Sequence, residues 1–394
     1  MTTESKIHLL VLAALTALLA LSCEPTNGDE TPDEDVDETF GTEYEEFRLT
    51  NVAGPFAHGW GMAHLSEGRI LVTERDGRLL LVDGDRVDEV DGLPDIAAQS
   101  QGGLLDVSVH PDFEETGEVY LTYSTADDDG ETATALSRGV LDGGSLVDVD
   151  EIFVQDRYSS PGRHYGSRIA WMDDGTLLMS IGDRGSEPMR AQDLDDHAGS
   201  IVRLEDDGSV PGDNPFVEDD DAHDEIYAYG LRNVQGMVVD GETDRIWVTD
   251  HGPRGGDELN LVEAGENYGW PVVTLGLDYG TEEVPDYAQG RRMEGMVDPV
   301  HEFSPTFAPS GLALVTGDEF PAWRGNLLAG GLRAERIRRV VVDEYDGEME
   351  MLHEEELLLR EIGRIRDVSQ GPDGAIYVLN DESNGGLFRV ASSD

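Results

Sequence analysis

The chain repeats one pattern six times between residues 61 and 381. Each repeat has an apolar strand, a polar turn that usually contains Asp-Gly, a second apolar strand and a polar residue at its end. Turn residues between two short apolar runs are typical of antiparallel hairpins. The second strands are expected to begin near residues 69, 118, 176, 245, 326 and 375. A repeat of this length, with uneven insertions, indicates a β-propeller whose long loops lie on one face.

No segment keeps an apolar period of 3.6 residues, so we expect few helices. The prediction is an all-β, six-bladed propeller over residues 47–394, with a two-sheet sandwich as the alternative. In a propeller the inner strands surround a channel. Polar residues at equivalent strand ends therefore converge at one mouth of that channel, although they lie far apart in the sequence.

The stretch from residue 229 to residue 270 carries the strongest sign of a binding site. A strand predicted at 246–249 runs into a loop rich in Gly and Pro, residues 252–258. Glycine lets the backbone approach a ligand, and bare carbonyls followed by the carboxylate of Glu258 are ligands that Ca²⁺ takes. Just upstream, a guanidinium and two amides suit a flat, polyanionic ligand; they belong to Arg232, Asn233 and Gln235. An ordinary surface turn with salt bridges is the alternative.

Other predicted strand ends carry a base and an amide. His164 precedes the third hairpin, and that hairpin ends at Asp183. A carboxylate near the imidazole could orient the ring and stabilise its charged form. Gln101 precedes two glycines ahead of the second hairpin. The alternative for His164 is a purely structural role.

Further arginines stand at equivalent positions. Arg333 follows the fifth hairpin, and Arg364 and Arg366 open the sixth, where a period of two points both to the same face. Together with Arg232 they predict a site for an anion that carries several carboxylates. Surface arginines paired with acids are the alternative.

The strongly negative net charge of the chain excludes some classes of binding partner. The 394 residues include 27 Lys and Arg against 84 Asp and Glu, a net charge of −57, and the single lysine is Lys6. Such a surface repels nucleic acid and anionic membranes. Because the acids run through the whole chain rather than through tails, we predict a protein adapted to high salt, from a halophilic source.

The N-terminus is typical of an exported lipoprotein. Residues 7–22 are almost wholly apolar but short for a membrane span, and Ser22 precedes the only cysteine, Cys23. We predict a signal peptide over 1–22, lipidation of Cys23, and an acidic, disordered tether over 23–46. The lipid would anchor the protein to a membrane, so that it faces the periplasm or the cell exterior. Plain signal-peptidase cleavage with an incidental cysteine is the alternative. A single cysteine excludes disulfides and Cys-based metal sites.

From about residue 47 to residue 390 the chain resembles the soluble PQQ-dependent sugar dehydrogenases of the glucose/sorbosone dehydrogenase family, and especially the bacterial aldose sugar dehydrogenases. The motifs that carry the resemblance occur in family order; they are QGGLLDVSVHPDF, RHYGSRIAW, IGDRG, YGLRNVQGM, HGPRGGDELN, ENYGWP, FSPTFAPSG and GRIRDVSQGPDGAIYVLND. The resemblance implies a six-bladed propeller that binds pyrroloquinoline quinone (PQQ) and Ca²⁺. It also implies oxidation of aldoses to lactones, with electrons passed to a quinone or cytochrome.

The resemblance implies roles for individual residues. His164 would take the proton from the sugar C1 hydroxyl, supported by Asp183. The residues that would hold the quinone are Gln101, Arg232, Asn233, Gln235, Tyr279, Gly331, Leu332, Arg333, Arg364 and Arg366. In one branch of the family, carbonyls that match Gly252 and Pro253 bind the cofactor's calcium. In the aldose branch, Glu258 and Tyr268 match a calcium site in the loop itself.

The chain departs from the family at a few positions. Ser167 stands where a second glycine is usual in part of the family, and Arg333 replaces a common lysine. Residues 300–306 lack the Tyr and Trp of the glucose-specific branch, so we expect broad aldose specificity. Two alternatives are a propeller that binds ligands without catalysis and a Ca²⁺-dependent lactonase-type hydrolase, which would need several side-chain carboxylates around a central metal.

Overall fold

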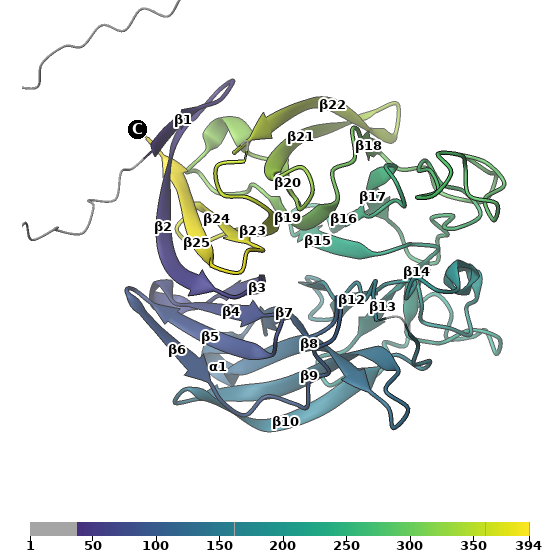
Figure 1. Cartoon of the computed structure of the whole chain (residues 1–394), viewed down its shortest axis with the longest axis horizontal. Helices are drawn as coiled ribbons and strands as arrows, with labels where there is room; N and C mark the ends of the chain where they lie inside the picture. Colours follow the sequence, from purple (N-terminus) through teal and green to yellow (C-terminus); the bar gives the residue numbers. More distant parts are fainter. Residues whose placement is uncertain (1–37, 161, 359, 394) are drawn as a thin grey trace, which may run out of the picture. The chain divides into compact units, whose positions relative to one another are not determined.

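The computed structural model describes residues 38–160, 162–358 and 360–393. These residues form six antiparallel sheets, which are the blades of a β-propeller. The innermost strand of each blade contacts the innermost strand of the next, and the sixth contacts the first, so the ring is closed. Figure 1 shows several of these strands around the centre. The predicted six-bladed propeller is confirmed.

Blades 1 to 3 are four-stranded meanders in which each strand pairs with the next along the chain. Blade 1 has β3 (Gly59–His64), β4 (Ile70–Glu74), β5 (Arg78–Asp83) and β6 (Arg86–Val90). Blade 2 has β7 (Leu104–Val109), β8 (Glu118–Ala126), β9 (Thr132–Asp142) and β10 (Ser145–Val154). Blade 3 has β11 (Ile169–Trp171), β12 (Leu177–Ile181), β13 (Ser200–Leu204) and β14 (Ile226–Tyr229).

Blades 4 and 5 repeat this plan, whereas blade 6 combines both ends of the described chain. Blade 4 has β15 (Val234–Asp240), β16 (Arg245–Asp250), β17 (Asp257–Val262) and β18 (His301–Phe303). Blade 5 has β19 (Pro309–Leu314), β20 (Leu327–Gly331), β21 (Arg336–Tyr345) and β22 (Glu348–Leu357). Blade 6 has β23 (Ile365–Gln370), β24 (Ile376–Asn380), β25 (Gly385–Ser392), β2 (Glu46–Phe56) and β1 (Glu38–Gly41).

The predicted hairpins match the structure closely. The second strand of each blade begins within one residue of the position that the repeat predicts, from β4 at Ile70 to β24 at Ile376. Helices are few, as expected, in the described part of the chain. It contains the short α1 (Phe113–Thr116) and three 3₁₀ turns, η1 (Ser66–Gly68), η2 (Pro188–Gln192) and η3 (Pro321–Trp323).

Blade 6 closes the ring by pairing β2 with β25, so that Phe47 lies opposite Ser392. In Figure 1 the purple strand of the N-terminal part lies beside the yellow C-terminal strands. Apolar residues alternate along the strands, and six of the apolar clusters each lie between two neighbouring blades. Because every blade is packed on both faces, the core is a ring of interfaces that holds the inner strand ends in place.

The predicted tether is wrong for residues 38–46. These residues contain β1, which pairs with β2. Phe40 stacks on Phe47 with 5.3 Å between ring centroids, and the carboxylate of Glu45 accepts a hydrogen bond of 2.7 Å from the Ala322 N–H. The pairing of β1 with β2, the stacking of Phe40 and the hydrogen bond to Glu45 attach this segment to the propeller. The predicted signal peptide, the rest of the tether and Cys23 lie outside the described residues.

Within the described ranges, no helix has the length and apolar character that crossing a membrane requires.

Candidate active site

His164 and Asp183 meet at the end of blade 3. His164 lies in the loop before β11, with a positive φ of 53°, and its Nδ1 is 2.6 Å from Oδ1 of Asp183, just after β12. Asp183 is almost fully buried; its Oδ2 accepts from Trp270 Nε1 at 2.8 Å and its Oδ1 accepts from the Gly185 N–H at 2.8 Å. Although burial opposes it, the hydrogen bond from His164 lowers the pKa of Asp183 below its ordinary value. Asp183 is therefore a fixed anion.

The ring of His164 is held so that one nitrogen stays available. Burial lowers the pKa of His164, the hydrogen bond to Asp183 opposes this, and the nearby charge of Arg232 lowers it further. A neutral imidazole that donates from Nδ1 to a carboxylate has its lone pair on Nε2. Nε2 lies 3.5 Å from Arg232 Nη2, and the side chain is 13% exposed. The geometry is that of a general base that a substrate can reach.

Backbone contacts fix this loop against its neighbours. The His164 N–H donates to Oε1 of Gln101 at 2.9 Å. The Gly166 N–H donates to Oδ1 of Asn233 at 3.1 Å. A side chain at Gly182 would collide with the carbonyl of His164, so a glycine is needed where the two loops cross. Two predicted cofactor residues, Gln101 and Asn233, thus position the loop of the base.

Arg232 and Asn233 connect β14 to β15, and Asp250 holds their backbone. Both N–H groups donate to the carboxylate of Asp250 at the end of β16, at 2.8 Å and 2.6 Å. The guanidinium of Arg232 lies over the ring of Trp270, 5.2 Å from its centroid, and donates to the carbonyl of His251 at 3.2 Å. Arg232 therefore has a fixed orientation beside His164.

Arg364 and Arg366 share the carboxylate of Asp381, which lies 3.2 Å from Arg364 and 2.7 Å from Arg366. This shared contact confirms the prediction that the side chains of Arg364 and Arg366 point to the same face. Arg366 also donates to Oε1 of Gln235 at 2.8 Å, and Arg364 approaches the carbonyl of Leu332 at 3.5 Å.

Partly buried His251 lies near both groups of arginines. Burial, together with the charges of Arg232, His164 and Arg366, lowers the pKa of His251 to about 3. The predicted approach of the base to an arginine is seen for Arg232, whose Nη2 lies 3.5 Å from Nε2 of His164.

Arg333 and Tyr279 are less closely tied to this group. Arg333 is exposed and lines a cavity of about 610 Å³ together with Leu332 and Arg364, while Gly331 is the last residue of β20. Tyr279 is 70% exposed, and no contact among the described residues joins it to the arginines. Instead Tyr287, which the sequence did not single out, packs against Trp270 with 5.6 Å between ring centroids.

The loop after β16 has the oxygens that a hard cation needs. The carboxylate of Asp257 accepts from the Gly252 N–H at 3.0 Å and so sets the turn that carries Gly252 and Pro253. Glu258 lies opposite Asp250 in the β16–β17 register, and burial together with the charge of Asp250 raises the pKa of Glu258 to about 8. Two neighbouring carboxylates in a poorly solvated place fit a site for Ca²⁺.

Tyr268 offers less than the resemblance implies. Its hydroxyl donates to the carbonyl of Leu261 at 2.9 Å and accepts from the Glu263 N–H at 2.9 Å. Because the hydroxyl is engaged in these bonds, the atom that Tyr268 could give to a cation is its main-chain carbonyl.

Three partners of the site had no role assigned from the sequence: Trp270, Asp250 and Asp381. Trp270 lies in the motif ENYGWP, whereas Asp250 and Asp381 are polar residues at strand ends, the feature that marks this face of the propeller. Their position at strand ends could therefore have been used to predict Asp250 and Asp381 as residues of the site.

The buried guanidiniums fit an anionic ligand. Nε of Arg232 and Nε of Arg366 are buried and have no hydrogen-bond partner among the described residues. Arg364 and Arg366 share one carboxylate, that of Asp381. The donor set therefore fits a flat ligand with several carboxylates, as PQQ is.

The chain is similar to known proteins over most of its length. It is 41% identical to the uncharacterized protein slr1608 of Synechocystis over 94% of this chain and 91% of that protein. It is 39% identical to the aldose sugar dehydrogenase YliI of Escherichia coli, over 85% of this chain and 90% of that one. The PQQ-bound form of an aldose sugar dehydrogenase from Streptomyces coelicolor superposes with a TM-score of 0.71 at 25% identity, covering 91% of this chain and 99% of that one. Residues 56–389 match the family model for Glucose / Sorbosone dehydrogenase, and the chain belongs to that family.

Proposed function

We propose that this protein is a PQQ- and Ca²⁺-dependent dehydrogenase that oxidises the C1 hydroxyl of aldose sugars to lactones and passes the electrons to a quinone or cytochrome. The observation that carries the proposal is the pair of His164 and Asp183 with Arg232 beside it, because it places a neutral base and a fixed cation together. The name of the Escherichia coli relative and the PQQ in the Streptomyces structure support the substrate class and the cofactor.

The chain supplies the acid–base part of this reaction. When bound, PQQ supplies the acceptor for the two electrons of the alcohol. Nε2 of His164 removes the proton of the C1 hydroxyl, and Asp183 stabilises the imidazolium that forms. Trp270 and Gly185 hold Asp183 in place through their N–H groups. Arg232, Arg364 and Arg366 would bind the carboxylates of the cofactor.

The calcium part of the proposal rests on the loop after β16. The carbonyls of Gly252 and Pro253 would hold a Ca²⁺ beside the cofactor, whereas the carboxylate of Glu258 and the carbonyl of Tyr268 would hold a Ca²⁺ in the loop itself. A cation there offsets the paired charges of Glu258 and Asp250.

The hydrolase alternative is disfavoured by a contact in the channel. Asp106 and Asp367 are buried near the centre, but Arg168 Nη1 lies 2.9 Å from one and 3.1 Å from the other. A guanidinium therefore occupies the position between two acids that a central metal would need.

Activity with several sugars tests the proposal. The purified protein is reconstituted with PQQ and Ca²⁺ in high salt, and dye reduction is measured with glucose, galactose, xylose and maltose. We expect turnover with several of them. Binding of PQQ without turnover on any sugar would instead favour a propeller that binds ligands without catalysis.

We also propose, from the first 23 residues and the net charge, that the protein is exported, anchored through a lipid on Cys23 and adapted to high salt.

A further inference from the structure

A second cluster of metal-binding side chains lies outside the channel, where blades 2 and 3 meet. One ligand atom from each of Asp156, His197 and His223 lies within 4.8 Å of the others. Asp156 follows β10, His197 precedes β13 and His223 precedes β14. The two imidazole rings stack with 4.1 Å between their centroids, and Phe153 packs edge-on against His197.

Both histidines have an unsatisfied nitrogen in this cluster. Nε2 of His197 and Nε2 of His223 are buried and make no hydrogen bond among the described residues. The His197 side chain is 4% exposed, and its Nε2 lies 3.6 Å from Oε2 of Glu225. Nε2 of His223 lies 3.3 Å from Oδ2 of Asp156. Each of these nitrogens therefore faces a carboxylate oxygen without a well-formed hydrogen bond, and a metal ion between them would satisfy both atoms.

The spacing is that of atoms around one metal ion. Zinc bonds of about 2.0–2.1 Å in a tetrahedron place neighbouring ligand atoms about 3.3 Å apart. The separation of 3.3 Å between Nε2 of His223 and Oδ2 of Asp156 matches this value, and a ligand atom of His197 lies within 4.8 Å of both residues. Because the two imidazole rings are stacked, they would turn toward the ion when it binds.

The chemistry of the donors selects the kind of ion. Imidazole nitrogens suit Zn²⁺ and its neighbours, whereas Ca²⁺ takes oxygen ligands. The cluster supplies one carboxylate, that of Asp156, and Glu225 adds a second negative charge 3.6 Å from His197. Arg157 lies beside the cluster, with its Nε 3.6 Å from Oδ2 of Asp156. The same oxygen lies 3.3 Å from Nε2 of His223, and the Asp156 side chain is 24% exposed.

We propose that Asp156, His197 and His223 form a structural site for a divalent transition metal of the Zn²⁺ class, with Glu225 beside His197. The ion would tie the segment after β10 to the segments that begin β13 and β14, and so would fasten blade 2 to blade 3. The site is separate from the quinone and calcium residues, and it does not depend on the proposed dehydrogenase activity.

Metal binding to the full chain tests this proposal without PQQ, sugar or dye. The protein is treated with a chelator, dialysed in high salt with excess Ca²⁺, and titrated with ZnCl₂ by calorimetry; bound zinc is then counted by elemental analysis. We expect about one Zn²⁺ per chain, a rise in melting temperature, and no displacement by Ca²⁺. With Co²⁺ as the probe, the visible absorption should be that of a tetrahedral ion.

Two variants locate the ion. His223→Gln should weaken zinc affinity at least about tenfold and abolish the rise in melting temperature. His110→Gln is the matched control, because His110 belongs to a second group, with Glu118 and Asp206, that contains one histidine rather than two. Failure of the wild type to bind zinc in excess Ca²⁺, or equal binding by His223→Gln and the wild type, would overturn the proposal.

Discussion

Nδ1 of His164 lies 2.6 Å from Oδ1 of Asp183, and the other carboxylate oxygen accepts a hydrogen bond from Trp270. His164 precedes β11 and Asp183 follows β12. Because the two strands are antiparallel, both residues lie at the open end of this hairpin, where they meet. Asp183 thereby holds the imidazole with Nε2 directed toward Arg232. This relationship underlies the first two predictions.

Replacement of the base should remove turnover and leave the cofactor bound. In His164→Gln the amide cannot take a proton, so we expect kcat to fall by about 10²–10⁴-fold. The guanidiniums are untouched, so the stoichiometry of bound PQQ should stay the same when it is measured by absorbance after gel filtration. Unchanged turnover would show that the base is assigned wrongly.

The pH profile should have its acid limb below the usual histidine range. His164 must be neutral to accept a proton, and its pKa is lowered from 6.5 by burial. Activity is therefore lost only as pH falls through that lowered pKa, and kcat/KM measured against pH should have its acid midpoint below 6.5. A midpoint above 6.5 would contradict this.

The variant Asp183→Asn provides the control for that profile. The carboxylate raises the pKa of His164 against the effect of burial, so its removal should move the acid limb to still lower pH and reduce kcat. A residue with a purely structural role would change kcat without moving the limb.

The arginines should differ in their tolerance of lysine. Arg366 donates to Gln235 and to Asp381 from different nitrogens, and one ammonium cannot reproduce both contacts. We expect Arg366→Lys to weaken PQQ binding about tenfold, which corresponds to about 1.4 kcal/mol. Arg333→Lys is the matched control and should change the affinity by less than about twofold, because Arg333 is exposed. A PQQ titration of each variant measures this, and equal losses would contradict the assignment.

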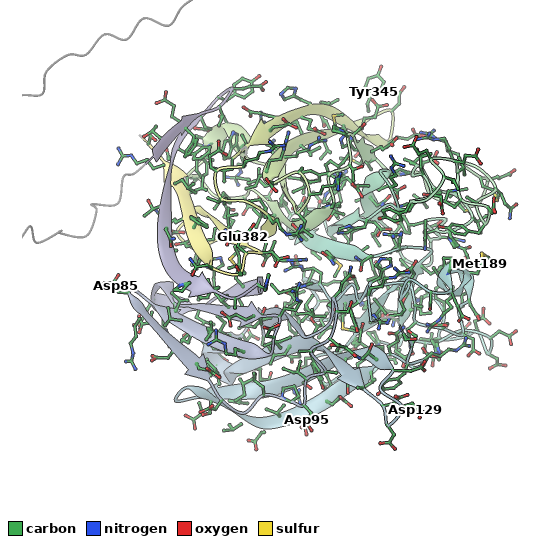
Figure 2. All side chains as sticks on the ribbon, viewed as in Figure 1. Asp85, Asp95, Asp129, Met189, Tyr345 and Glu382 are labelled. Atoms are coloured by element: carbon green, nitrogen blue, oxygen red, sulfur yellow. The ribbon has the colours of Figure 1, made fainter. Side chains whose placement is uncertain are left out.

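Low salt should destabilise the folded protein. The acids outnumber the basic residues by 84 to 27, and many of the arginines are already in ion pairs. Exposed acids such as Asp85 and Asp129 project from the outer edge of the blades in Figure 2. Salt screens their repulsion, with a Debye length of about 3 Å at 1 M and 30 Å at 0.01 M. The melting temperature should fall on dialysis from molar to millimolar NaCl; a constant value would contradict adaptation to salt.

The parts of the structure that depend on local sequence patterns were predicted better than those that depend on contacts between distant residues. Turn residues and alternating strands are local, so the starts of β4 and β24 were predicted to within one residue. The pairing of β2 with β25 joins the two ends of the described chain and leaves no local sign. The order in residues 38–41 was missed because it depends on the contact of Phe40 with Phe47 rather than on composition.

In the candidate active site, too, local relationships were predicted and contacts between distant residues were not. The pairing of His164 with Asp183 was predictable because both flank one hairpin. Trp270 reaches Asp183 from a loop of another blade, and only the folded ring shows that contact. Tyr279 was assigned by resemblance alone, and its side chain is 70% exposed.

Calcium should stabilise the protein through Glu258. Burial and the neighbouring Asp250 make its charge unfavourable, and a bound cation would offset both charges. Ca²⁺ added after chelation should therefore raise the melting temperature of the wild type. Glu258→Gln removes one of the two charges and should abolish that rise. Glu282→Gln is the matched control, because Glu282 pairs with Arg254 of the same loop but is exposed. Calorimetric melting curves measure the shift, and the same rise in all three proteins would place the calcium elsewhere.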